Sequence, residues 1–310
     1  MNSDSSIRSD IQALEPFASD LNAFFRRFEA ESLFRKPPAK DMPEVAARRI
    51  REGRYLLRPC GCELREETAG SAAHELLEVL DQHLPERRDE VAKILHAFAN
   101  GQSEPSTFAG SAFRNRGNEI VRFQRQFDLA DDLVAFFAVC LVRPYRSQVA
   151  RTLTEGVDLA EWKCGYCPVC GHWPNLGHLW SEDGRLTLWC LHCGTSWAFK
   201  RLQCPFCLNE DQGSLTVLSP EAEDACRLHA CQKCRRYVKE IRSENPAEQF
   251  PFLQNALGAV GLDYLALQEG YIRESPLTVR YEDPDGNELL LYRQTAGTVE
   301  TSPDSVSGTL

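Results

Sequence analysis

Four Cys-x-x-Cys pairs stand between residues 167 and 234 of this 310-residue chain: Cys167-Pro-Val-Cys170, Cys190-Leu-His-Cys193, Cys204-Pro-Phe-Cys207 and Cys231-Gln-Lys-Cys234. Two residues between the cysteines let one tight turn direct both sulfurs at a common point, and a second turn from a distant segment completes a four-cysteine site. The first two pairs are separated by 19 residues and the last two by 23, enough for a short hairpin that returns to the metal. The stretch therefore predicts two tandem metal ribbons.

The predicted metal ligands are the eight thiolates of these pairs, taken in chain order. One ion would be held by Cys167, Cys170, Cys190 and Cys193, and the other by Cys204, Cys207, Cys231 and Cys234. Four thiolates suit zinc and a single rubredoxin-type iron equally well, so the expected cofactors are two ions of iron or zinc. In the first ribbon Gly171 and Gly194 follow the second cysteine of a pair, where glycine can take the positive φ of a knuckle turn. The second ribbon has no such glycines.

A disulfide framework would use the same cysteines. However, the chain shows no signal-peptide pattern and no apolar run long enough to span a bilayer. We therefore expect a cytoplasmic protein without membrane insertion, in a reducing compartment that favours metal ligation over disulfides. Sites saturated by protein sulfur keep no open position for water or substrate, and no common catalytic motif is present, so we expect no enzyme and no catalytic residues.

The other cysteines and histidines are not needed to complete either site. Cys164, which precedes the first pair, and Cys226, which precedes the last, are expected to be spectators, and Cys60 and Cys62 are expected to lie in a loop. Cys140 belongs to the apolar face of a helix. The histidines near the pairs are expected around the ligands or at the surface; they are His172, His178, His192 and His229.

Upstream of the ribbons the apolar pattern is helical. Leu133, Phe136, Phe137, Cys140 and Leu141 follow the spacing of one helix face, with Arg143-Pro144 as the predicted end. Similar faces recur at four further places, which are Phe24 to Phe28, Leu76 to Leu84, Val91 to Phe98 and Ile120 to Phe127. His96 lies off its apolar face and is expected in solvent. The pattern predicts a helical bundle.

Downstream, a helix is predicted over about 250–267 and a β-hairpin over 277–291, around the turn-forming residues 283–287. The predicted fold class is α+β: an amino-terminal helical bundle, two tandem rubredoxin-like or zinc-ribbon modules, then a short helix and a β-hairpin. The corresponding divisions are 1–160, 161–203, 204–245, 246–294 and a disordered tail over 295–310.

The charge of the chain argues against a general nucleic-acid binder. The net charge is −10. Residues 162–245 contain ten Lys or Arg and nine Asp or Glu, whereas binding to a phosphate backbone depends on an excess of positive charge. With no catalytic motif, a protein that binds a partner protein is the leading interpretation. Two alternatives remain: a zinc-ribbon protein that binds nucleic acid, and a rubredoxin-like redox or thiol protein. Nucleic-acid binding that weakens steeply with salt would favour the first alternative. A metal that cycles between oxidation states, or a reactive thiol, would favour the second.

The residues around the pairs resemble the formate dehydrogenase accessory protein family, FdhE. The resemblance rests on Cys167-Pro-Val-Cys170-Gly171, on Leu188-Trp-Cys190 with Trp197 downstream, and on the two later pairs, with Tyr237-Val-Lys239 after the last one. A second similar stretch is Leu262-Asp-Tyr-Leu-Ala266 with Gly270-Tyr-Ile-Arg-Glu-Ser-Pro276.

This resemblance implies a cytoplasmic protein that binds the catalytic subunit of a respiratory formate dehydrogenase before its export and assists its maturation. It also implies rubredoxin-like sites, with iron as the favoured metal, at the same eight cysteines. We expect the helical domain and the ribbons to form a cleft for that subunit. Aromatic residues concentrate at binding hot spots, so the candidate contact residues are Trp173, Trp180, Trp189 and Trp197, with packing in the core as the alternative for Trp189 and Trp197. Arg235, Arg236 and Lys239 are expected to form a solvated basic cluster.

Overall fold

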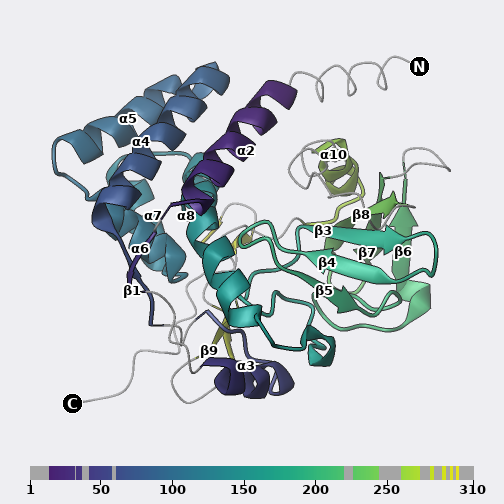
Figure 1. Cartoon of the computed structure of the whole chain (residues 1–310). Coiled ribbons are helices and arrows are strands. Elements are labelled where there is room, and N and C mark those ends of the chain that lie inside the picture. Colours follow the sequence, from purple (N-terminus) through teal and green to yellow (C-terminus); the bar gives the residue numbers. More distant parts are fainter. Residues whose placement is uncertain are drawn as a thin grey trace, which may run out of the picture.

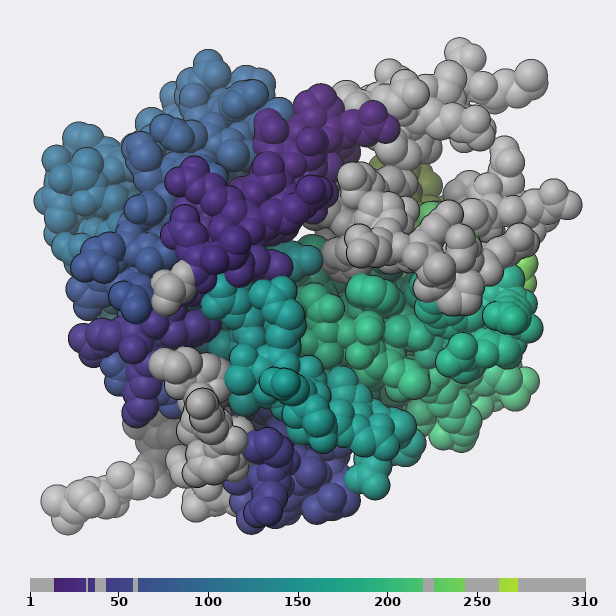
Figure 2. Space-filling view, viewed as in Figure 1, coloured from purple at the N-terminus to yellow at the C-terminus, as the bar shows by residue number. Residues whose placement is uncertain are grey.

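The computed structural model describes most of the chain. The described residues are 14–31, 33–36, 42–57, 61–219, 226–243 and 260–272, with the short strands 280–282, 288–290, 294–295 and 298–299. The chain forms a helical part followed by a sheet-containing part, and the two pack against each other (Figures 1 and 2). The expected α+β class, with helices preceding two four-cysteine groups, is confirmed.

The helical part contains one long helix with shorter helices around it. The elements are α2 (Glu15–Glu29), α3 (Met42–Arg51), α4 (Glu66–His83), α5 (Arg88–Ala99), α6 (Pro105–Phe113), α7 (Gly117–Gln126) and α8 (Asp131–Thr154), with the strand pair β1 (Phe34–Lys36) and β2 (Glu63–Leu64). The apolar faces predicted from the sequence are buried: Leu76 and Leu77 of α4 and Ile94 of α5 are 0% exposed. His96 is exposed, as expected. Helices α3 and α6 were not predicted.

Helix α8 lies between the shorter helices and the sheet (Figure 1). The prediction that it ends at Arg143-Pro144 is wrong, because it continues to Thr154. A proline inside a helix costs about 3 kcal/mol through a lost hydrogen bond and a clash. Beyond Pro144, however, Tyr145 and Val149 are 0% exposed. Each large apolar side chain buried in this way contributes about 1.5–3 kcal/mol, which offsets the proline.

By length and composition alone, α8 could cross a membrane, and among the described residues it is the one helix that meets this test. Its apolar stretch is 83% buried inside the protein. It is therefore placed as the core helix of the helical part.

The metal-bearing part contains one six-stranded sheet. Its strands are β3 (Leu176–Trp180), β4 (Leu186–Trp189), β5 (Ser196–Phe199), β6 (Leu215–Leu218), β7 (Cys226–Cys231) and β8 (Tyr237–Ser243), in the order β5-β4-β3-β8-β7-β6. Each ribbon contributes an antiparallel three-stranded half. The halves join through β3 and β8, which run parallel from Leu176 opposite Lys239 to Trp180 opposite Ser243. The predicted ribbons are thus two halves of a single sheet.

The carboxy-terminal elements follow the sheet. Helix α10 (Val260–Gln268) packs against β7, and residues 250–259 of the predicted helix lie outside the described residues. The predicted hairpin is present as β9 (Arg280–Glu282) paired antiparallel with β10 (Glu288–Leu290). The tail contains a short pair, β11 (Gln294–Thr295) with β12 (Thr298–Val299), where no regular structure was expected. Residues 300–310 lie outside the described residues.

Candidate metal centres

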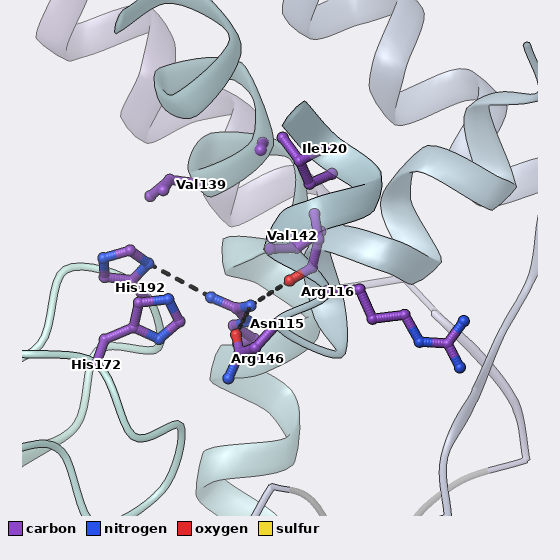
Figure 3. A pocket seen from close by; sticks show the side chains of 11 residues that line it. Asn115, Arg116, Ile120, Val139, Val142, Arg146, His172 and His192 are labelled. Atoms are coloured by element: carbon purple, nitrogen blue, oxygen red, sulfur yellow. Dashed lines mark hydrogen bonds between the residues drawn. The ribbon is translucent and has the colours of Figure 1, made fainter. Parts of the chain in front are cut away.

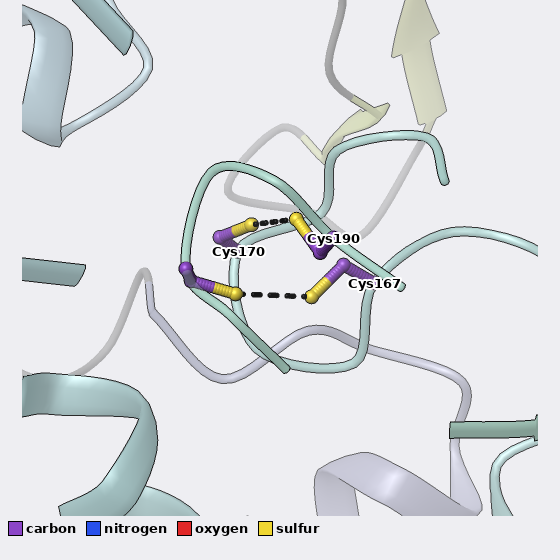
Figure 4. Close-up of side chains that lie close together, drawn as sticks. Cys167, Cys170 and Cys190 are labelled. Atoms are coloured by element: carbon purple, nitrogen blue, oxygen red, sulfur yellow. Dashed lines mark hydrogen bonds between the residues drawn. The ribbon is translucent and has the colours of Figure 1, made fainter. Parts of the chain in front are cut away.

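The structure brings the eight paired cysteines together in two groups of four. Within each group, all four Sγ atoms lie within 4.8 Å of one another. In the first group Cys167 and Cys193 are 3.4 Å apart at sulfur, as are Cys170 and Cys190 (Figure 4). In the second group the corresponding distances are 3.6 Å for Cys204 to Cys234 and 3.7 Å for Cys207 to Cys231.

These separations fit a tetrahedral ion. Metal–sulfur bonds of about 2.3 Å place the sulfurs of a tetrahedron roughly 3.8 Å apart. A disulfide would need about 2.05 Å, and none of the described cysteines forms one. Four sulfurs directed at one point are the donor set of zinc or of a rubredoxin-type iron.

The four knuckles share one pattern of backbone hydrogen bonds. In each, the N–H of the first cysteine donates to the carbonyl five residues later: His172, Thr195, Asn209 and Arg236 are the acceptors, at 2.8–3.0 Å. The N–H four residues after the first cysteine donates back to that cysteine's carbonyl, also at 2.8–3.0 Å. This closed turn fixes the direction of both sulfurs, so the sequence spacing becomes a repeated local structure.

The residue that follows the second cysteine has a positive φ in every knuckle. In the first ribbon it is glycine, as predicted, with φ of 76° at Gly171 and 74° at Gly194. In the second ribbon Leu208 has φ of 57° and Arg235 has φ of 58°. A residue other than glycine is strained in this conformation. The knuckle turn therefore imposes the same backbone on both ribbons, whatever the side chain.

The first group is closed to solvent by the helical part. Its four cysteines are 0–2% exposed. The N–H groups of Leu56 and Leu57 donate to the carbonyls of Pro168 and Val169 at 3.0 and 2.7 Å, so the chain after α3 pairs with the first knuckle. Inside the group, the Val169 N–H donates to Cys167 Sγ at 3.4 Å. The group is thus enclosed at the junction of the two parts of the protein.

A buried polar cluster connects the helices to this group (Figure 3). Arg146 of α8 is 2% exposed, and its Nη1 lies 3.4 Å from Nδ1 of His192. Its Nη2 donates to Asn115 Oδ1 at 2.5 Å, and Asn115 Nδ2 donates to the carbonyl of Cys170 at 3.0 Å. His172 stacks on His192, with ring centroids 3.7 Å apart. Burial, together with the charge of Arg146, lowers the pKa of His192 to about 3, so its imidazole is neutral at pH 7.

Sequence reasoning did not find Arg146, although the sequence holds a signal for it. Arg146 lies four residues after Val142 and three before Val149, which places it on the buried face of α8. The expectation that this helix ends at Pro144 concealed that position.

The second group is more open. Cys204 and Cys231 are 2% and 1% exposed, whereas Cys234 is half-buried and Cys207 is exposed. Asn209 Nδ2 lies 3.8 Å from Cys231 Sγ. Phe206, between the paired cysteines, packs on Trp173 of the first ribbon at a centroid distance of 5.3 Å. One side of the second group therefore faces solvent, and the other faces the first ribbon.

The remaining cysteines lie outside both groups. Cys164 Sγ is 4.0 Å from the carbonyl oxygen of Gly53, and Cys226 begins β7. Cys62 is buried, and Cys60 lies outside the described residues. Cys140 is buried in α8 as predicted, where burial raises the pKa of its thiol to about 12.

Two expectations about exposed side chains are wrong. Trp173 is 8% exposed and so is not a surface contact residue, because so small a sheet needs its large aromatics as core. Trp197, at 2% exposed, takes the core position that was its alternative, and Trp180 and Trp189 are half-buried. Lys239 is 6% exposed and donates to Asp263 at 3.0 Å, so it is not part of a solvated cluster. Of the two placements expected for the histidines, burial excludes the surface for three: His172, His178 and His192 are 4%, 2% and 1% exposed. His229 contacts Glu240 at 3.1 Å.

Several known proteins similar to this chain carry the name FdhE homologue. FdhE homologues from Aquifex aeolicus and Pseudomonas aeruginosa are 29% identical over 150 residues and 28% identical over 160 residues. This chain spans about half the length of each, 51% in both cases. An FdhE homologue from Glaesserella parasuis is 25% identical over 278 residues, which cover 84% of this chain and 89% of that protein.

The similarity extends to three dimensions. The crystal structure of the FdhE protein from Pseudomonas aeruginosa matches with a TM-score of 0.55 over 86% of this chain and 92% of that chain. At 19% identity this match shows a common fold. No family model matches the chain.

Proposed function

Because this chain belongs to the FdhE family, we propose that it is an accessory protein of a formate dehydrogenase, acting by binding rather than by catalysis. The client would be the catalytic subunit, bound in the cytoplasm before export and assisted in its activation. Two ions, one in each four-cysteine group, would hold the binding surface in shape. A reducing cytoplasm fits this proposal, since the thiols must remain reduced to ligate metal.

The closure of the first four-cysteine group supports a role in binding rather than in catalysis. Its four sulfurs lie within 4.8 Å of one another and its cysteines are 0–2% exposed, so an ion bound by all four would keep no position for water or substrate. Saturated sites of this kind supply folding energy to small domains that bury little apolar surface. The eight cysteines are therefore proposed as structural ligands.

The surface proposed to receive the client lies on the metal-bearing part. Among the described residues, every large hydrophobic side chain that is exposed falls between 202 and 272: Leu202, Leu208, Val217, Tyr264, Leu267 and Ile272. Helix α10 buries Leu262 and Ala266 at 5% and 0% and exposes Tyr264 and Leu267 at 66% and 60%. Exposed apolar side chains concentrated on one part of a protein support a binding role there. We name these six residues the apolar surface.

The test compares metal content with client binding in one set of variants. Cys190→Ser and Cys231→Ser remove one ligand from each group, and Cys226→Ser is the matched control, since this cysteine lies outside both groups. We expect each ligand variant to lose metal and to lose co-purification with the catalytic subunit, while the control keeps both. A metal-free variant that still matures the dehydrogenase would overturn the structural role of the ions.

A second arm tests the apolar surface with metal in place. Tyr264→Glu and Leu267→Glu place charge on the exposed face of α10, and Ala92→Glu does so on the exposed face of α5. We expect client affinity to fall about tenfold or more for the first two, as for hot-spot residues, and to be unchanged for the third. Elemental analysis and a visible spectrum identify the ion, because ferric tetrathiolate is coloured and zinc is not.

A further inference from the structure

Within the described part of the chain, Arg146 is a buried cation without a carboxylate partner. It lies in the middle of α8 and is 2% exposed. Its Nη2 donates to the carbonyls of Ala112 and Phe113 and to Asn115 Oδ1, and its Nη1 faces His192. All these partners are neutral groups. In the described part of the chain it is the only buried arginine, and no Asp or Glu forms an ion pair with it.

A buried charge needs a compensating charge. The desolvation penalty of an ion amounts to several kcal/mol even after relaxation, and hydrogen bonds to neutral groups do not cancel it. Arg146 also satisfies the last carbonyls of α6, a role that a neutral amide could share. Capping alone therefore does not explain why a guanidinium occupies this position.

The nearest source of negative charge is the first four-cysteine group. Four thiolates around a divalent ion carry a net charge of −2, and around a trivalent ion −1. His192, whose Nδ1 is 3.4 Å from Arg146, stands between the ligands Cys190 and Cys193. Asn115 connects the same guanidinium to the carbonyl of the ligand Cys170. Arg146 is thus held against both ligand-bearing turns of the first group.

We propose that Arg146 is the counter-charge of the first metal centre, supplied by the helical part to an ion held by the ribbon. The first ion and the packing of α8 against the ribbon then stabilise each other. Among the described residues the second group has no equivalent: the buried cation nearest to it in sequence, Lys239, is already paired with Asp263 at 3.0 Å. Arg146 is a positioning and charge-compensating residue rather than a ligand.

A small cavity of about 20 Å³ lies beside the cluster, lined by Asn115, Arg146, His172 and His192 among others. Among the described residues, Arg146 Nε and His172 Nδ1 have no hydrogen-bond partner. A volume of this size is sufficient for one water molecule. A small anion in the same cavity is the competing source of counter-charge, and the experiment separates the two.

The experiment measures release of both ions from the full-length protein to a coloured chelator. Cys234→Ser, which lacks a ligand of the second group, identifies the phase that belongs to the first. We expect Arg146→Gln to accelerate first-site release by about 10- to 100-fold, the range for residues that support metal ligands, and to leave the second phase unchanged. Arg146→Lys keeps the charge but loses the planar fork, so its first-site release should stay close to the native rate. Arg151→Gln removes an exposed arginine of the same helix and should release both ions like the native protein.

Asn115→Asp is the second variant, in case Arg146→Gln does not fold. It places a carboxylate at the atom that already contacts Arg146, and Asp tolerates the positive φ of 58° at this position. An ion pair there should preserve folding while it draws the guanidinium charge away from the thiolates, so first-site release should accelerate. Asp also loses the Nδ2 donor to the carbonyl of Cys170, so Asn115→Gly, which tolerates the same φ and loses both contacts, is its control. Faster release in Asn115→Asp than in Asn115→Gly supports the counter-charge, and equal release in the two variants contradicts it.

The proposal rests on the metal-binding part of the proposed function, and the outcomes distinguish the two. A native protein that binds no ion at the first group overturns both. Bound metal with native release rates in Arg146→Gln and Asn115→Asp overturns only the counter-charge. A further outcome also overturns the counter-charge: the native protein and Arg146→Gln release the first ion at equal rates, and chloride or formate raises the melting temperature of the native protein alone. An anion in the cavity would then compensate the charge of Arg146.

Discussion

Leu208 and Gly171 occupy the same position in their knuckles and share the same backbone conformation, with φ of 57° and 76°. The left-handed region costs a residue with a β-carbon about 1–2 kcal/mol and glycine almost nothing. We therefore predict that Leu208→Gly stabilises the metal-loaded protein, by about 0.5–1 kcal/mol once the greater freedom of glycine in the unfolded chain is subtracted. Denaturant unfolding with the metal content held constant measures this difference.

Arg235 is the matched comparison, since its φ of 58° carries the same strain. Its side chain donates to the carbonyl of Gly270 at 3.2 Å and lies over the ring of Tyr271 at 4.3 Å. Arg235→Gly should therefore be neutral or destabilising. An equal gain from both substitutions would show that these side-chain contacts contribute nothing.

Gly171 and Gly194 separate backbone strain from steric conflict. A β-carbon at Gly171 would lie 2.8 Å from Cδ1 of Tyr55, whereas at Gly194 the nearest atom would be Nη1 of Arg143 at 3.7 Å. We predict that Gly194→Ala costs about 1–2 kcal/mol from strain alone. Gly171→Ala should cost at least about 1 kcal/mol more, because overpacking adds to the strain, and should weaken first-site metal binding. Equal losses of stability would show that Tyr55 moves aside freely.

The sequence predicted the local structure well, because it is encoded in short spacings. The Cys-x-x-Cys turns, the strands that leave them and most apolar helix faces depend on neighbours within a few residues. The parallel pairing of β3 with β8 was missed because it joins residues about 60 positions apart, and no local pattern marks it. It depends on close approach at Gly177, where a β-carbon would lie 3.3 Å from both Glu240 and Val238.

Other misses arose where burial outweighs local preference. Helix α6, with the sequence PSTFAGSAF, has small side chains without a clear apolar stripe, and it forms because Phe108, Ala109 and Phe113 are buried against its neighbours. Pro144 would end an isolated helix but is tolerated within the buried α8. Residue type alone could not separate surface from core for the tryptophans near the cysteines, because exposure is a property of the folded sheet.

The unequal exposure of the two groups predicts an order of metal loss. The first group is 0–2% exposed, whereas Cys207 of the second is exposed to solvent. A chelator should therefore remove the ions in two phases, with the second-site ion released first and faster on the order of tenfold, since the surrounding shell controls access. Cys234→Ser should abolish the fast phase and leave the slow one. A single phase for both ions would contradict this prediction.

The thiol of Cys140 predicts a pH dependence on the alkaline side. Burial raises its pKa from 9.0 to about 12 in the folded protein. The unfolded chain therefore loses this proton at lower pH than the folded protein. The contribution to stability is complete below pH 9 and is lost as the pH rises from about 9 towards 12, by up to about 1.4 kcal/mol per pH unit. Cys140→Ala should remove this part of the slope, and the difference between the two unfolding curves measures it. Parallel slopes for the two proteins would rule out the effect.

Lys239 and Asp263 attach α10 to the second half of the sheet through a buried ion pair. Their side chains are 7% and 11% exposed, and Tyr237 donates to the same carboxylate at 2.7 Å. Removing one partner leaves an uncompensated buried charge, which costs about 3–5 kcal/mol unless the element detaches. We therefore predict that Asp263→Ala releases α10, seen as faster hydrogen exchange of its amides while the amides of β3 and β4 stay protected.

A paired substitution tests whether an unpaired buried charge is what releases α10. Lys239→Met with Asp263→Leu removes both charges, so it should restore most of the protection that either single substitution loses. Lys200 and Glu210 form an exposed pair, at 57% and 53%, whose removal should change stability by no more than about 1 kcal/mol. If the double variant is no better protected than Asp263→Ala, α10 is held by its apolar contacts at Leu262 and Ala266 rather than by the ion pair. Client binding should follow the same order, because α10 contributes Tyr264 and Leu267 to the apolar surface.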